Sequence, residues 1–275
     1  MSIEGDLVTA LVPVWGLYAG DDLDEAVASL IAQDFPARIV VLDNASDTPV
    51  HVPEGVELLR ASSRLTLGGI RNLGLSQVAT PFVVVWDADD VMLPGTLGFL
   101  VERLRADEGC VAFGAGIVDA VTGGRYRWPR RWMLRMLRFP RAFALLQCVW
   151  SAYPTTGATL MRTTNVRDAG GYTDTVSSSD WGLGAALAFR GRLGWSERPG
   201  RIYRLRPGSV WARHSDMAQL VQHSQAVRRR LREDRGIPGW ARALLPAIGL
   251  AQYVALFVLR PPRLAVRSIG RRLGR

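Results

Sequence analysis

The chain has 275 residues, 48% of them hydrophobic, so it is long enough to bury a substantial core and too apolar to be disordered throughout. All 34 basic residues are arginine, which excludes lysine chemistry such as Schiff-base catalysis or a Walker A phosphate loop. Only Cys110 and Cys148 are present, without the cysteine and histidine spacing of a zinc site, so we expect neither a disulfide framework nor bound zinc.

The formal net charge of +9 comes from the C-terminal end of the chain. Residues 228–275 contain 12 arginines and two acidic residues, whereas residues 1–227 are nearly neutral. Residues 1–6 are acidic and lack the basic start of a secretory signal. We therefore expect a cytoplasmic protein whose basic character belongs to its tail.

Apolar strands and amphipathic helices alternate along the N-terminal part of the chain. We predict strands over 8–15, 38–42, 56–60 and 82–86, and helices that begin near Asp21, cover 68–78 and open at Pro94. This alternation with short connections predicts an α/β fold with a Rossmann-like, mostly parallel sheet flanked by helices.

Three carboxylates follow the most apolar of these strands. The run 82–86 is apolar at every position, which predicts a strand buried on both faces, and Asp87, Asp89 and Asp90 come directly after it. Open α/β sheets bind ligands at the C-terminal ends of their strands. A cluster of this kind suits Mg²⁺ or Mn²⁺ with phosphate oxygens, and the alternative is a solvated turn rich in aspartate.

Two further polar segments fall at the same edge of the predicted sheet. Asp43 follows the strand 38–42 and can accept from a base N–H or a ribose hydroxyl, although the segment 43–47 alone is typical of a plain turn. The Gly68–Gly69 pair with Arg71 offers flexible backbone and a guanidinium for phosphate, or simply a helix start with a surface arginine. Because all of these features share one crevice, we interpret them as one ligand site.

In their order along the chain, these motifs resemble those of family 2 glycosyltransferases. The matching segments are 23–33, 39–46, 69–74, 85–90, 156–162, 169–172, 178–181 and 203–209. The resemblance covers roughly residues 7–212. It implies a GT-A fold, a nucleoside-diphosphate sugar as donor, Mn²⁺ or Mg²⁺ as cofactor, and an inverting transfer to an acceptor hydroxyl.

The resemblance also implies how the donor is held. Asp43 would contact the nucleobase, and Pro13 and Val14 would line the nucleobase pocket. Arg71 lies in a segment that, in members of the family, comes close to the nucleotide. The opening strand continues as Val-Trp-Gly over 14–16, where the family usually has a small polar residue and an asparagine. This departure leaves the identity of the donor open.

For the metal, the resemblance implies ligands from the aspartate cluster. Asp87 and Asp89 would hold ribose and metal, and Asp90 would be the most direct metal ligand. His214 is a candidate third ligand, although its polar neighbours are also typical of a surface histidine.

For the acceptor side, the resemblance implies that Asp180 is the general base and that Gly157 and Trp181 shape the acceptor pocket. An inverting transfer needs such a carboxylate opposite the departing nucleoside diphosphate. The family's acidic pair reads Ser179–Asp180 here, so one carboxylate is missing while the base is kept. From its local sequence alone, Asp180 would be interpreted as a helix N-cap.

Two segments favour an anionic membrane surface. Residues 125–141 interleave arginine with tryptophan, methionine, leucine and phenylalanine, as suits a lipid headgroup interface. Residues 241–275 contain the uncharged stretch 243–259 and an arginine-rich end. That stretch is at the short limit for a spanning helix, so an in-plane or re-entrant helix is favoured over it. The alternative is a helix packed on the domain with a solvated basic end.

We therefore expect three segments. Residues 1–110 form the nucleotide-sugar-binding half and 111–227 the acceptor-binding half of one GT-A domain, and 228–275 form a basic, apolar helical tail. The expected function is sugar transfer to a glycan or lipid-linked acceptor in cell-envelope or polysaccharide synthesis, peripheral to the cytoplasmic face of the membrane. The alternatives are an inactive nucleotide-sugar-binding scaffold and a nucleic-acid-binding protein acting through its tail. Because the body is nearly neutral and has no recognition motif, nucleic acid is not expected.

Overall fold

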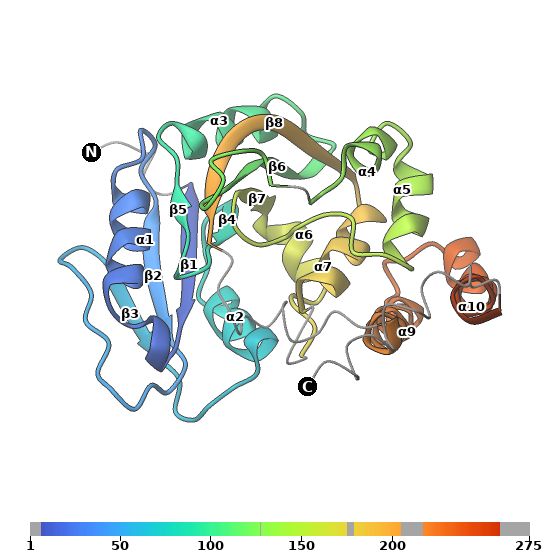
Figure 1. The fold of residues 1–275 in the computed structure, drawn as a ribbon, viewed down its shortest axis with the longest axis horizontal. Helices are drawn as coiled ribbons and strands as arrows, with labels where there is room; N and C mark the ends of the chain where they lie inside the picture. Colours follow the sequence, from blue (N-terminus) through green and yellow to red (C-terminus); the bar gives the residue numbers. More distant parts are fainter. Residues whose placement is uncertain (1–6, 127, 175–178, 205–216, 259–275) are drawn as a thin grey trace, which may run out of the picture.

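The structure, a computed structural model, describes residues 7–126, 128–174, 179–204 and 217–258 (Figure 1). Its centre is an eight-stranded sheet in the order β3-β2-β1-β4-β7-β6-β8-β5. The strands are β1 (Val8–Val14), β2 (Arg38–Asp43), β3 (Glu57–Arg60), β4 (Phe82–Val85), β5 (Val91–Met92), β6 (Cys110–Asp119), β7 (Thr159–Arg162) and β8 (Arg192–Tyr203).

Helices follow most of these strands and lie on both sides of the sheet (Figure 1). They are α1 (Asp21–Ile31), α2 (Leu67–Ser76), α3 (Thr96–Arg105), α4 (Arg131–Met136), α5 (Pro140–Gln147), α6 (Thr163–Asp168), α7 (Ser179–Ala188), α9 (Met217–Glu233) and α10 (Gly239–Tyr253). A short 3₁₀ turn (Gly16–Tyr18) follows β1, and a π-helical turn (Val254–Val258) follows α10.

The N-terminal half of the sheet is parallel, as the alternation of apolar runs and helices predicts. β1 pairs with β2 on one side and with β4 on the other, and β2 pairs with β3. Every residue of β1 and of β4 is buried, because helices cover both faces of these strands. The predicted strands therefore end within one or two residues of the observed ones. Their C-terminal ends share one edge of the sheet.

The C-terminal half joins the same sheet with mixed strand directions. β7 lies antiparallel between β4 and β6, and β6 runs parallel to β8. The two-residue strand β5 pairs antiparallel with β8, which places Met92 opposite Arg201. The sequence predicts a helix directly from Pro94. In the structure β5 precedes it and α3 begins at Thr96.

Two apolar layers enclose the sheet. One layer contains the buried faces of α1 and α3, with Leu30 and Leu100 among its members. The other contains residues from α2, α5, α7, α9 and α10, including Leu231 and Leu245. The described part of the C-terminal tail therefore packs into the core of the domain. No helix among the described residues has the length and apolar character needed to cross a membrane.

Candidate active site

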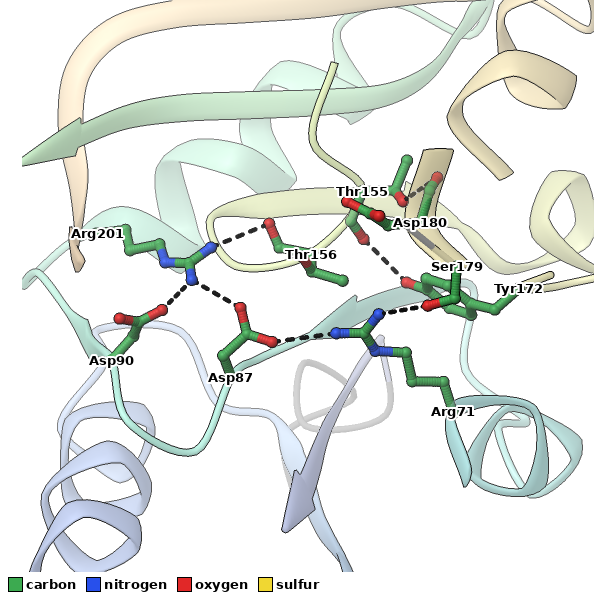
Figure 2. A network of polar contacts seen from close by, with 9 residues as sticks. All are labelled: Arg71, Asp87, Asp90, Thr155, Thr156, Tyr172, Ser179, Asp180 and Arg201. Atoms are coloured by element: carbon green, nitrogen blue, oxygen red, sulfur yellow. Dashed lines mark hydrogen bonds and ion pairs between the residues drawn. The ribbon is translucent and has the colours of Figure 1, made fainter. Parts of the chain in front are cut away.

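Asp87 lies at the centre of a polar network just past the end of β4 (Figure 2). Its Oδ1 pairs with Nη2 of Arg71 at 3.2 Å, and its Oδ2 pairs with Nη2 of Arg201 at 2.6 Å. The turn that carries it is closed by a bond from the backbone N–H of Asp90 to the carbonyl of Asp87. The Asp87 side chain is 27% exposed, so the network is open to solvent at this point.

Asp90 is the buried member of the aspartate cluster. Its side chain is fully buried, its Oδ2 forms an ion pair with Arg201, and its Oδ1 accepts from the backbone N–H of Arg204 at 3.1 Å. Burial raises the pKa of Asp90 to about 7, with Arg201 opposing the shift and Asp87 and Asp89 adding to it. Ionised Asp90 therefore depends on nearby positive charge.

Arg201, in β8, supplies much of that positive charge, and its side chain is almost completely buried. It is 5% exposed, and its guanidinium lies over the rings of Tyr203 and Trp86, 5.0 and 6.0 Å from their centroids. The segment before β7 leaves room for it. Gly157 has φ +74°, and a Cβ on this glycine would lie 1.9 Å from Nη1 of Arg201.

Arg71, on α2, connects the aspartate cluster to the start of α7. It is buried, and its Nη1 donates to Oγ of Ser179 at 2.8 Å, while Nη2 pairs with Asp87 (Figure 2). Its guanidinium lies over the ring of Tyr172, whose hydroxyl donates to the carbonyl of Thr155 at 2.9 Å. The predicted phosphate-side arginine thus lies between two carboxylate-bearing segments.

Asp180 follows Ser179, which Arg71 contacts in addition to Asp87. Since α7 begins at Ser179, Asp180 falls within the first helical turn and not at the cap position. Its side chain is half-buried, and its backbone carbonyl accepts from Oγ1 of Thr155 at 3.0 Å. Burial raises the pKa of Asp180 above its ordinary value, while Arg71 opposes the shift and Asp87 adds to it. A raised pKa makes this carboxylate a stronger base than an exposed aspartate.

Asp43 and its neighbours form a tight turn at the end of β2. Pro13 and Val14 are buried in β1, and Val14 is the register partner of Asp43. Oδ1 of the buried Asp43 accepts from the backbone N–H of Ser46 at 2.9 Å, and Oδ2 pairs with Arg60 at 2.5 Å. Both carboxylate oxygens thus have partners of the kind expected for a turn, and the nucleobase contact stays a prediction.

The remaining predicted residues have different surroundings. Trp181 is 2% exposed and donates from Nε1 to the carbonyl of Gln147 at 2.6 Å, so it is a core residue, and its place in an acceptor pocket stays a prediction. Asp89, the third member of the aspartate cluster, is half-buried. His214 lies outside the described residues. Among the residues that the structure describes, no three histidine, cysteine or acidic side chains are arranged as a metal site.

The sequence motifs do not identify Arg201 or Tyr172 as parts of this network. Tyr172 belongs to a family-like segment, which is the signal that could have drawn attention to it. Arg201 is one of 34 arginines and precedes the last such segment. Its role depends on the pairing of β8 with β5, which the local sequence does not reveal.

Among solved structures, the chain is similar to two proteins that were solved with sugar nucleotides. One is S. aureus TarS 1-349 in complex with UDP-GlcNAc, with TM-score 0.67 and 14% identity over 90% of this chain and 73% of that chain. The other is the mannosyltransferase PcManGT from Pyrobaculum calidifontis in complex with GDP-Man and Mn²⁺, with TM-score 0.58 and 18% identity over 97% of this chain and 79% of that chain. These similarities confirm the predicted GT-A fold.

Sequence comparison then identifies the family. The chain matches none of the curated proteins with which it was compared. A sequence model of the family described as "Glycosyl transferase family 2" matches residues 10–170, which are more than half of the chain. The match confirms the resemblance of the motifs, and the protein belongs to glycosyl transferase family 2.

Proposed function

We propose that the protein is an inverting glycosyltransferase that moves a sugar from a nucleoside-diphosphate sugar to an acceptor hydroxyl. One observation carries the proposal. Arg71 bonds both to Asp87, at the end of β4, and to Ser179, the neighbour of Asp180. A single guanidinium therefore connects the carboxylates suited to the donor's charged end with the carboxylate suited to the acceptor.

In this proposal Asp180 takes the proton from the attacking hydroxyl. Inversion requires a base on the face of the sugar opposite the departing diphosphate. The raised pKa of Asp180, which burial causes, favours proton uptake. Arg71 holds the start of α7 through Ser179 and so orients the base, and it can donate to a donor phosphate through the same guanidinium.

The aspartate cluster has the chemistry that a divalent cation requires. Carboxylate oxygens are the hard ligands that Mg²⁺ and Mn²⁺ prefer. Oδ2 of Asp90 is buried and, apart from its ion pair with Arg201, accepts no hydrogen bond among the described residues, so it keeps the capacity to bind a cation. Asp89 and Asp90 would hold Mn²⁺ or Mg²⁺, with His214 as the candidate third ligand. When bound, such an ion neutralises charge on the departing diphosphate.

A glycan or a lipid-linked molecule is the acceptor that we propose, in cell-envelope or polysaccharide synthesis, with the protein peripheral to the cytoplasmic face of the membrane. The support is a set of exposed apolar side chains on and beside α4, α5 and α10, and these helices lie at the same end of the molecule (Figure 1). A hydrogen bond from Gln252 to the carbonyl of Val149 connects α10 to the segment after α5. The exposed large side chains on and beside these helices are Trp132, Phe139, Trp150, Trp240, Leu244, Leu250 and Tyr253.

Charge on the same surface favours anionic lipid. Arg135, Arg138 and Arg141 are exposed beside Trp132 and Phe139, and among the described residues they have no ion-pair partner. Aromatic rings that insert at the headgroup level and guanidinium groups that meet lipid phosphate are the combination found in interfacial helices. Buried residues of α10 pack into the core while its other face stays exposed, as suits an in-plane helix.

Thermal unfolding in the presence of nucleotides tests the donor proposal. UDP, GDP, dTDP and CDP are each added with Mn²⁺ or with EDTA to the wild type and to Asp90→Ala. We expect one nucleotide to raise the melting temperature only with Mn²⁺, and the shift to disappear in Asp90→Ala. The matching sugar nucleotides are then supplied with glycan or lipid-linked acceptors. Nucleotide binding without turnover would favour the inactive scaffold, and no shift with any nucleotide would contradict the donor assignment.

A further inference from the structure

We infer that Arg201 is an internal counterion of the aspartate cluster that takes the place of the divalent cation while no donor is bound. The inference rests on the proposed function and adds a regulatory property to its site. On this view, Arg201 excludes Mn²⁺ or Mg²⁺ from the nucleotide-free protein. When a nucleoside diphosphate binds, its phosphate oxygens pair with the guanidinium in place of the aspartates, and the cation can then bind.

The ion pairs of Arg201 are the first support. Its Nη2 lies 2.6 Å from Oδ2 of Asp87 and also pairs with Oδ2 of Asp90, so one nitrogen bridges the two carboxylates (Figure 2). Both Arg201 and Asp90 are almost completely buried. Arg201 therefore occupies Asp90, which is one of the carboxylates that would hold the cation.

The surroundings of Arg201 show that this position is built into the fold. β8 carries it opposite Met92 of β5, Gly157 leaves the space that a Cβ would fill, and the ring of Tyr203 lies 5.0 Å beneath the guanidinium. Nη1 also donates to the carbonyl of Thr156, at 3.4 Å. An arginine held by two strands, a glycine and an aromatic ring is not a surface side chain that meets the acids by chance.

In the described part of the chain, two atoms at the ion pair between Arg201 and Asp90 lack hydrogen-bond partners, and they indicate which ligand could replace this ion pair. Nε of Arg201 is buried without a hydrogen-bond partner among the described residues, and Oδ2 of Asp90 has only its ion pair with Arg201. An N–H donor fits a phosphate oxygen, and a carboxylate oxygen fits a divalent cation. A diphosphate with its cation therefore satisfies both groups, whereas a cation alone would be placed beside an unscreened guanidinium.

It follows that the cation and the diphosphate bind with positive coupling. Mn²⁺ alone has to compete with Arg201 for Asp90, the carboxylate that both would bind. Once phosphate oxygens attract the guanidinium, the carboxylates become available. Thermodynamic linkage requires the effect to be reciprocal, so Mn²⁺ strengthens diphosphate binding by the same factor.

Mn²⁺ binding to the full chain, followed by the electron paramagnetic resonance signal of free Mn²⁺, tests the inference without reference to activity. The wild type is titrated alone and with saturating UDP or GDP. Arg201→Gln, which removes the charge, and Arg201→Lys, which keeps it, are titrated alone. We expect Arg201→Gln to bind Mn²⁺ about tenfold more tightly than the wild type or Arg201→Lys, within the usual range of coupling factors.

The outcomes separate this inference from the proposed function. The inference would be overturned if the wild type without a nucleotide bound Mn²⁺ as tightly as Arg201→Gln does. Equal Mn²⁺ affinities of Arg201→Gln and Arg201→Lys would also overturn it. Tighter Mn²⁺ binding in Arg201→Gln, with no effect of UDP or GDP on the wild type, would support the counterion and contradict UDP and GDP as the nucleotide of the donor. If Arg201→Gln does not fold, the wild-type titration without nucleotide decides, because weak Mn²⁺ binding supports the inference and tight Mn²⁺ binding overturns it.

Discussion

Gly157 and Arg201 depend on each other in this structure. Gly157 adopts φ +74°, its N–H donates to the carbonyl of Val85 at 2.7 Å, and a Cβ on it would lie 1.9 Å from Nη1 of Arg201. The segment before β7 can therefore come this close to the end of β4 only if position 157 is a glycine. This close passage lets a β8 arginine reach the aspartates that follow β4.

Gly157→Ala should therefore destabilise the protein more than its backbone conformation alone explains. An L-residue in the left-handed region costs about 1–2 kcal/mol. Displacing Arg201 adds the larger cost of a buried charge without its partner, on the order of 3 kcal/mol. The free energy of unfolding, measured in urea, gives the total.

Gly123→Ala is the matched control for that measurement. Gly123 has φ +67°, and a Cβ added to it would meet nothing within 4 Å, so its substitution reports backbone strain alone. Equal losses of stability in the two variants would show that Arg201 does not need the space at Gly157.

Asp90 should make the stability of the metal-free protein depend on pH. Its folded-state pKa of about 7 lies above that of an unfolded aspartate, so the folded state binds the proton more tightly. The resulting stabilisation is complete below pH about 4 and is lost as the pH rises to about 7, at up to about 1.4 kcal/mol per pH unit. Asp90→Asn should remove this slope.

Urea unfolding of the wild type and Asp90→Asn in EDTA at several pH values measures the effect, because other titrating groups contribute equally to both proteins. Parallel curves for the two proteins between pH 4 and 7 would contradict the raised pKa of Asp90. A difference that grows with pH is the expected result.

The N-terminal half of the fold could be predicted from the sequence because its signals are local. β1, β2 and β4 are apolar runs buried on both faces, and each predicted strand ends within one or two residues of the observed one. The positions of Asp87 and Asp180 around one site follow from the family motifs. Their surroundings follow from contacts between distant segments.

Arg201 illustrates what local signals cannot provide. It reaches Asp87 across 114 residues of chain, from β8, in which charged residues and a proline interrupt any apolar run. Trp181 illustrates the same limit for a residue that the family motif does identify. The family motif predicts a pocket residue, whereas its buried contact with Gln147 depends on how α5 packs against α7.

Asp180→Asn should abolish transfer while nucleotide binding persists. Loss of a general base lowers the rate by about 10² to 10⁴ fold, because the hydroxyl then attacks without proton removal. In the wild type, the raised pKa of Asp180 places the acidic limb of kcat/KM at higher pH than for an ordinary aspartate, and activity falls as the pH drops through it.

Initial rates across pH, together with nucleotide-induced shifts in melting temperature, check both parts. Asp168→Asn is the control, since Asp168 is an exposed aspartate at the end of α6. Retained turnover in Asp180→Asn would remove this residue from the mechanism. Loss of nucleotide binding would instead indicate that it supports the donor site.

Arg135→Glu should weaken binding to anionic membranes. Each arginine near the surface contributes about 1 kcal/mol of attraction, so reversing one charge should lower the affinity for phosphatidylserine vesicles by about tenfold or more. Arg105→Glu is the matched control, because Arg105 is also an exposed arginine in the last turn of a helix but lies on α3. Both variants change the net charge and the helix terminus in the same way.

Vesicle sedimentation therefore distinguishes a defined surface from general charge attraction. A larger loss for Arg135→Glu than for Arg105→Glu is expected if the surface of α4, α5 and α10 faces the lipid. Equal losses would mean that the whole basic chain is attracted without orientation. Failure of the wild type to sediment with these vesicles would exclude the membrane surface and favour an acceptor that reaches the site from solution.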